Sequence, residues 1–151
     1  MNYASLAARI KDWGAELGFQ AVGIADADLS AAEPGLAAWL QRGWHGEMDY
    51  MARHGLARAR PAALIAGTLR VISCRMNYSA TDADEKAALA DQARAYVARY
   101  ARGRDYHTLV RSRLQALCDR IETETGPFRY RVFADSAPVL EVELAARAGI
   151  G

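Results

Sequence analysis

The sequence of 151 residues contains little cysteine, little lysine and no long apolar run. Its two cysteines, Cys74 and Cys118, form no Cys-x-x-Cys pair, which argues against a disulfide scaffold and against a metal site built from cysteine alone. We therefore expect a protein of the reducing cytoplasm. The longest uncharged stretch is well short of the roughly 18 apolar residues that a membrane-spanning helix needs. The first residues lack the basic-then-apolar pattern of a signal peptide.

The net charge is close to zero, because 19 basic side chains oppose 18 acidic ones. Nucleic acid binding would therefore need a local basic patch, since the whole chain has no electrostatic signature for it. The 17 arginines, 2 lysines and 32 alanines are more typical of a GC-rich coding sequence than of a selected property. The length suits one compact domain over residues 1–151.

Apolar spacing and helix-terminal residues predict helices that alternate with short strands. The predicted strands cover residues 19–25, 69–76 and 128–134. The predicted helices cover residues 3–17 and 34–41, Thr81 to about Tyr100, Asp105 to Gly126, and Pro138 to Ala148. Thr81 and Asp84 have the spacing of a capping box. This order predicts an α/β fold, with a small, mostly central sheet flanked by helices.

Asp135 lies in the turn between the last predicted strand and the last predicted helix. Ligands of open α/β sheets bind beside the carboxyl ends of strands, where such turns lie. Asp135 is therefore either a helix cap or turn carboxylate, or a functional proton donor. A helix N-terminus stabilises the charged carboxylate. A proton donor at this position would need a bound cofactor or substrate that shields it from water.

Residues 44–58 are dense in side chains that carry chemistry. His45 and His54 lie nine residues apart, which is no helical metal-ligand spacing, and no third ligand is evident, so we predict no metal site. Arg58 and Arg60 stand just before Pro61 in an irregular stretch. These two cations either receive an anion or are solvated surface arginines.

Residues 103–107 open a predicted helix whose backbone N–H groups would suit a phosphate or an amide-rich cofactor edge. The best local basic patch of the chain surrounds them, although a solvated helix surface would have the same composition. Its members are Arg94, Arg99, Arg102, Arg104, Arg111 and Arg113. The first predicted strand carries the single glycine Gly23, so a dinucleotide-binding turn is not supported.

In combination, several stretches resemble the amino-terminal domain of epoxyqueuosine reductases, which are cobalamin-dependent iron–sulfur enzymes of tRNA modification. The stretches are residues 46–51 with Arg58, residues 103–107, residues 135–141, and residues 145–151. The match as a whole covers nearly the whole chain, and the order and spacing of these stretches make the combination specific. The resemblance implies a fold similar to the cobalamin-binding domains of these enzymes and of reductive dehalogenases.

The resemblance also implies a reaction and its residues. Cobalamin in its Co(I) state would open the epoxide of epoxyqueuosine in a tRNA anticodon stem-loop, and loss of water would leave queuosine, the last step of its biosynthesis. Asp135 would be the proton donor, covered by the corrin and the nucleoside. The family pattern gives no cobalt axial ligand. It implies cobalamin contacts at Arg58, Ala98 and Arg99, and pocket positions at Tyr106 and His107.

Members of this family continue into a ferredoxin-like part that holds two [4Fe–4S] clusters. Cys74 and Cys118 cannot supply a cluster that needs four ligands. We therefore expect a chain that is truncated at its C-terminus, lacks its electron supply and is inactive alone. We further expect a monomer without membrane contact.

Two other functions stay open. A related cobalamin and iron–sulfur reductase, such as a reductive dehalogenase, would have no affinity for RNA. A non-catalytic corrinoid-binding domain would be indifferent to the exchange of Asp135 for asparagine.

Overall fold

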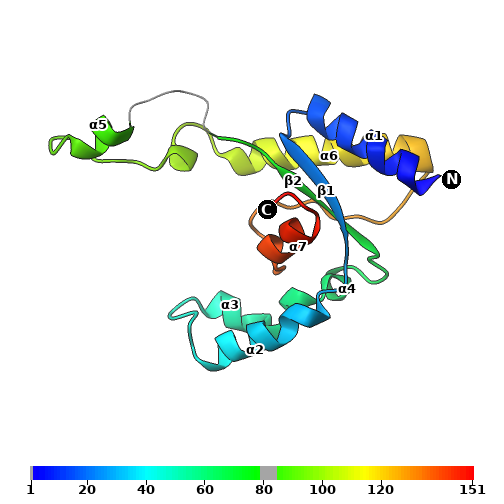
Figure 1. The fold of residues 1–151 in the computed structure, drawn as a ribbon, viewed down its shortest axis with the longest axis horizontal. Coiled ribbons are helices and arrows are strands. Elements are labelled where there is room, and N and C mark those ends of the chain that lie inside the picture. Colours follow the sequence, from blue (N-terminus) through cyan, green and yellow to red (C-terminus); the bar gives the residue numbers. More distant parts are fainter. Residues whose placement is uncertain (1, 79–84) are drawn as a thin grey trace.

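The structure is a computed structural model that describes residues 2–78 and 85–151. At its centre lies a two-stranded antiparallel sheet (Figure 1). Strand β1 (Ala21–Asp26) pairs with strand β2 (Arg70–Arg75) along its full length. Each strand is rich in β-branched or small residues, which suit a short buried ribbon.

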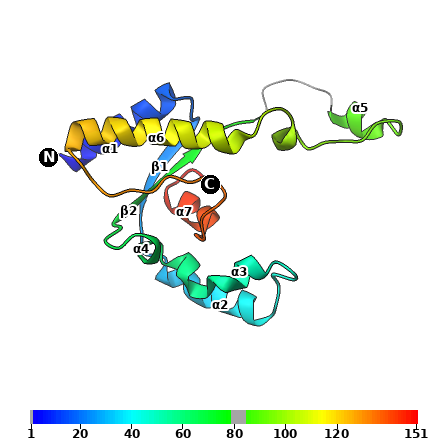
Figure 2. The same ribbon diagram turned by 180° about the vertical axis from the view of Figure 1, so that it is seen from behind.

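The two longest helices, α1 (Tyr3–Glu16) and α6 (Tyr106–Thr125), cover one face of this sheet (Figure 2). Both begin at side-chain caps: Asn2 accepts from two backbone N–H groups of α1, and Asp105 accepts from the first turn of α6. Alternate strand residues point toward the helices, as the strand period of two requires. The resulting core consists of Ile10, Leu117 and Ile121, packed against Val22, Ile24, Ile72 and Cys74.

The opposite face is covered by helix α7 (Glu141–Arg147). Gly23 permits this close approach, because a Cβ atom there would lie 2.5 Å from the carbonyl oxygen of Ala148. A second core joins α7 to helix α2 (Glu33–Gln41) and the segment after it. Its buried members are Leu29, Leu36, Ala59, Val139 and Leu144.

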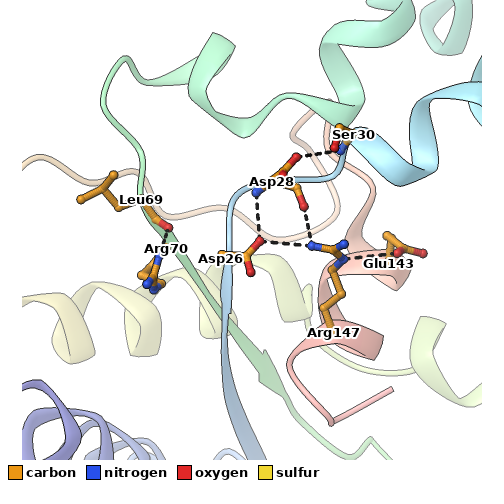
Figure 3. A network of polar contacts seen from close by, with 7 residues as sticks. All are labelled: Asp26, Asp28, Ser30, Leu69, Arg70, Glu143 and Arg147. Atoms are coloured by element: carbon orange, nitrogen blue, oxygen red, sulfur yellow. Dashed lines mark hydrogen bonds and ion pairs between the residues drawn. The ribbon is translucent and has the colours of Figure 1, made fainter.

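An ionic network fixes α7 against the end of β1 (Figure 3). The guanidinium of Arg147 lies 3.1 Å from a carboxylate oxygen of Asp26 and also donates to the carbonyl oxygen of Asp28. Its Nε atom lies 3.5 Å from Glu143, one helical turn earlier. These contacts set the position of the chain that leads into α7.

Between α2 and β2 the chain forms short helical pieces. They are α3 (Asp49–Arg53), the 3-10 helix η2 (Gly55–Ala59) and α4 (Pro61–Leu64), while another 3-10 turn, η1 (Ser30–Ala32), precedes α2. Beyond β2, helix α5 (Glu85–Ala90) and the 3-10 turn η3 (Arg99–Ala101) form an arm that extends away from the sheet (Figures 1 and 2).

The structure confirms the predicted helices that became α1, α2 and α6, and both strands. The single helix from Thr81 to Tyr100 is wrong, because α5 ends at Ala90; the capping box at Thr81 and Asp84 lies outside the described residues. Mixed helices around a small sheet are consistent with the expected α/β class. Nowhere in residues 2–78 and 85–151 does a helix have the length and apolar content to cross a membrane.

The predicted third strand over residues 128–134 is wrong. This segment runs in an irregular path beside α6, where the Gln115 amide donates to the Tyr130 hydroxyl at 2.6 Å. Phe133 of this segment packs against the second core, and among the described residues the segment pairs with no strand. The last helix begins at Glu141 and not at Pro138.

The contact between α1 and β1 predicts an effect on stability at Gly14. A Cβ atom there would overlap the Cγ2 methyl group of Val22, so Gly14→Ala should lower the free energy of unfolding by about 1–3 kcal/mol. Gly35 in α2 has open space around it, so Gly35→Ala should be neutral or stabilising by up to about 1 kcal/mol. Urea unfolding of both variants measures this difference. Equal midpoints would contradict the packing of α1 on β1.

Candidate functional site

An open pocket of about 700 Å³ lies beside the start of α7. One wall is the chain from Asp135 to Glu143, and the other comes from residues 50–58. Arg58 and Asp135, which the family resemblance singles out, thus lie on two walls of one pocket although they are far apart in sequence.

Arg58 builds the pocket from within and does not face solvent. Its side chain is 7% exposed, and its Nε and Nη2 atoms donate to the carbonyl oxygens of Met51 and Tyr50 at 3.1 and 2.9 Å. Its own carbonyl oxygen accepts from the backbone N–H of Leu140 at 3.2 Å. Buried polar groups are stable when hydrogen-bonded in this way. Arg58 therefore connects both walls, and the idea of a solvated surface arginine is wrong for it.

Asp135 occupies a special backbone position. Its φ of 54° is the one positive φ outside glycine among the described residues. A left-handed conformation is unfavourable for most residues, although aspartate tolerates it better than most, and such positions are enriched at functional sites. The side chain of Asp135 is 54% exposed. The turn thus presents a carboxyl group at the pocket wall.

Tyr106 holds this carboxyl group. Its hydroxyl donates to Oδ2 of Asp135, and this bond, with the neighbouring negative charge, raises the pKa of Tyr106 to about 12. The raised pKa keeps the phenol protonated as a donor throughout the physiological range. Tyr106 is the first residue of α6, so the helix start fixes the direction of its ring.

His107 lies beside Tyr106 at the same carboxylate oxygen. Its Nε2 atom is 3.8 Å from Oδ2 of Asp135, and its ring stacks on Tyr106 with centroids 4.2 Å apart. The cap residue Asp105 accepts from the His107 backbone N–H at 2.9 Å and lies 2.7 Å from its Nδ1 atom. These contacts hold the pKa of Asp105 below its usual value. The structure therefore brings Tyr106, His107 and Asp135 together.

Two neighbours of Asp135 were not predicted from the sequence. Arg111, one turn into α6, donates to the Ser136 hydroxyl at 2.8 Å and anchors the turn. Glu141 lines the same pocket, where desolvation and the charge of Asp135 raise its pKa. The only signal for Glu141 was its place in the family motif, because an acidic residue in a first helical turn is ordinary.

The structure differs from two sequence-based expectations for Asp135. Residues 128–134, which lead directly into its turn, form no strand, and Asp135 does not cap α7, whose N-cap is Leu140. Asp135 reaches the pocket because the Tyr106 and Ser136 contacts fold the turn onto α6.

The other residues singled out from the sequence do not contact Asp135 in the same way, and most of them lie outside the pocket. Arg60 forms a two-point contact with Glu33, both at 2.8 Å, so it is not paired with Arg58 around an anion. His54 lines the pocket, whereas His45 contacts the Gly46 carbonyl outside it. Ala98 and Arg99 lie at η3 on the arm. Across the described part of the chain, no group of three or more His, Cys, Asp or Glu side chains is arranged to hold a metal ion.

The arginines of the predicted basic patch differ in their surroundings. Arg94 pairs with Asp91, and Arg102 lies over the Tyr96 ring at 5.3 Å and donates to a backbone carbonyl. Arg113 turns inward to the carbonyl of Gly18 at 3.5 Å. Arg113 therefore does not contribute to a surface at the start of α6.

Comparison with known proteins places this site in a family. The family model described as "Epoxyqueuosine reductase QueG, DUF1730" matches residues 58–136, just over half of the chain. This matched range includes Arg58, Tyr106, His107 and Asp135.

Curated proteins named epoxyqueuosine reductase are similar along the whole chain. The protein of Burkholderia pseudomallei is 60% identical over 164 residues, which cover 98% of this chain and 40% of that protein. Those of Vibrio cholerae and Escherichia coli are 58% and 56% identical over 151 residues, which cover 100% of this chain and 41% and 40% of theirs. The chain thus spans about two fifths of the length of these relatives. No solved structure matches it. From the family match and these identities, the chain belongs to the epoxyqueuosine reductase family.

Proposed function

We propose that this chain is the cobalamin-facing part of an enzyme that reduces epoxyqueuosine to queuosine in tRNA, with Asp135 as the proton donor. The observation that carries the proposal is the position of Asp135. Within the matched family region, its carboxyl group is held by Tyr106 and presented at the wall of a pocket. The reaction itself is the one for which the curated relatives are named.

The chemistry of the pocket residues fits a corrinoid. The rim of a corrin carries amide groups, which need both hydrogen-bond donors and acceptors. Ser136, Asp135 and Glu141 supply a hydroxyl and two carboxyl groups along one wall, while Val142 adds apolar surface. Arg58 would act by shaping the opposite wall, because its guanidinium already donates to two carbonyl oxygens. Ala98 and Arg99 on the arm, with Tyr106 and His107, remain the proposed further contacts.

Asp135 would have to keep a proton until the epoxide opens. A carboxyl group that water reaches is ionised at neutral pH, and Asp135 is 54% exposed in this structure. A flat ligand over the pocket would exclude water and favour the protonated acid. The Asp135 carboxyl would then donate its proton to the epoxide oxygen. Bound cobalamin would supply the reducing electrons, while the protein binds, orients and provides the proton.

The proposed partners follow from the same assignment. The substrate would be a tRNA anticodon stem-loop that carries epoxyqueuosine, whose base must leave its stack to enter a pocket. A [4Fe–4S] cluster needs four cysteine ligands, and this chain has two. Burial raises the pKa of Cys74 to about 12 and that of Cys118 to about 11, which disfavours the thiolate that binds iron. The electron donor would therefore act through a segment beyond this chain.

The cofactor assignment predicts binding of hydroxocobalamin. The purified chain should retain corrin through gel filtration, as its visible spectrum would show. Val142→Trp should weaken retention, because Val142 is 83% exposed on the pocket wall. The matched control Leu69→Trp, 75% exposed away from the pocket, should not. The same measurement should be made on a chimera in which this chain replaces the matching segment of the Vibrio cholerae relative, because residues outside this chain could also contact the corrin. If both the purified chain and the chimera eluted without corrin, the assignment would be refuted.

The proton-donor role predicts the effect of Asp135→Asn in this chimera. Asparagine keeps the shape of the side chain but has no acidic proton, so conversion of epoxyqueuosine-containing tRNA should fall by about 100-fold or more. Corrin retention and tRNA binding should be unchanged. Asp12→Asn, which changes an exposed acid on α1, serves as the control. Full conversion by Asp135→Asn would contradict catalysis by Asp135, and absence of tRNA binding by the unaltered chimera would point to another cobalamin reductase.

A further inference from the structure

Three consecutive residues at the start of α6 converge on the Asp135 turn. Asp105 is the cap, Tyr106 donates to Oδ2 of Asp135, and His107 places Nε2 at 3.8 Å from the same oxygen. The Tyr106 and His107 rings stack on each other with centroids 4.2 Å apart, so both reach the same carboxylate oxygen. The imidazole ring thus lies between two carboxyl groups.

The two ring nitrogens have different neighbours. Nδ1 lies 2.7 Å from Asp105, which is within hydrogen-bond distance, whereas Nε2 is about one ångström farther from Asp135. Asp105 also accepts from the His107 backbone N–H, so this one carboxylate contacts both the backbone and the ring of His107. The side chain of Asp105 is 67% exposed and that of His107 is 37% exposed. Water therefore reaches the histidine from the Asp105 side.

A proton donor must be recharged after each turnover. Once a ligand covers the pocket, Asp135 loses its direct access to water, and its carboxyl group is lined by Tyr106 and His107. Tyr106 is a poor source, because its pKa is about 12. Glu141 lines the same pocket and would be covered together with Asp135. His107 is the neighbour that also contacts the exposed Asp105, and imidazole is the side-chain type suited to proton transfer near neutral pH.

We propose that His107 returns a proton to Asp135 after each turnover, and that Asp105 and Tyr106 position the ring and the carboxyl group for this transfer. The inference rests on the proposed function, because it assumes that Asp135 is the donor. His107 and its two neighbours act through Asp135, so they are positioning and relay residues.

The proton balance is simple. The doubly protonated ring donates its Nε2 proton to Oδ2 of Asp135, which becomes the neutral acid. The ring becomes neutral and keeps its Nδ1 proton, which it donates as a hydrogen bond to Asp105. A hydronium ion from solvent then reprotonates Nε2 and is left as water. A small rotation of either side chain closes the 3.8 Å gap to hydrogen-bond distance.

Other charged groups near the relay are few. Arg111 acts on Asp105 and anchors Ser136, while Glu141 shares the pocket with Asp135. Tyr100 from η3 lies close enough to contribute to the raised pKa of Tyr106. Any pH dependence of the relay therefore includes these groups, and variants that preserve them are the informative ones.

The relay predicts that His107→Gln separates the first turnover from later ones. In the chimera, steady-state turnover should fall about 100-fold further than single-turnover conversion from a state charged at low pH, because Asp135 already carries its proton in the first turnover. Steady-state turnover of the variant should also fall about tenfold for each unit by which the pH rises, because hydronium becomes the proton source. Added imidazole should restore it. His45→Gln, outside the pocket, is the matched control.

Equal loss in single and multiple turnover, or no rescue by imidazole, would overturn the relay. Asp135→Asn would still be inactive in that case, so the donor assignment would stand. Inactivity of the unaltered chimera would instead refute the proposed function.

A second measurement tests the geometry in this chain without any activity. Asp135→Asn removes the charged acceptor of the Tyr106 hydroxyl, so the pKa of Tyr106 should fall from about 12 toward its ordinary value of 10.0. NMR of tyrosine labelled at Cζ resolves the individual rings, and Tyr106→Phe assigns the signal. Asp12→Asn should leave the titration unchanged. A Tyr106 that titrates like a free phenol in the unaltered chain would show that Asp135 is not held beside the relay.

Discussion

The buried guanidinium of Arg58 is the constraint on which the pocket depends. The guanidinium donates to two carbonyl oxygens of α3. The backbone carbonyl of Arg58 accepts from the N–H of Leu140 at the start of α7. The two walls of the pocket are thereby joined through one residue. A charged group is rarely buried unless its donors are satisfied, so the surrounding backbone must adopt the path that satisfies them. This requirement explains how Arg58 can shape the pocket with its donors already satisfied.

The start of α6 supplies a second fixed point. Asp105 is at once a helix cap and the partner of the His107 ring, so one carboxylate orders both the backbone and a side chain. Tyr106 and Arg111 then hold the Asp135 turn from the same helix. The left-handed backbone of Asp135 is maintained by these contacts. Side chains on a rigid helix thus position a carboxyl group that lies in a loop, as precise sites generally require.

The sequence predicted the parts of this arrangement that depend on short-range chemistry. Helix α6 begins at its aspartate cap and ends at Gly126, whose φ of 82° suits a glycine, as the cap residues indicated. The segment over residues 128–134 was predicted wrongly. Its apolar alternation is compatible with a strand, but strand formation needs a hydrogen-bonded neighbour, which no local pattern can supply. Asp135 was predicted from a strand-to-helix turn and from the family motif, but residues 128–134 form no strand and Leu140 caps α7.

What the sequence determined by itself was the family, the ends of the main helices, the two paired strands and the motifs that contain Arg58, Tyr106, His107 and Asp135. These depend on residue identity and near neighbours, which are written directly in the chain. Only the tertiary structure decided that Arg58 is buried, that Arg113 turns inward, and that Asp105, His107 and Asp135 form one line of polar groups. Such facts depend on contacts between residues distant in sequence, and those contacts exist only after the cores on both faces of the sheet have packed.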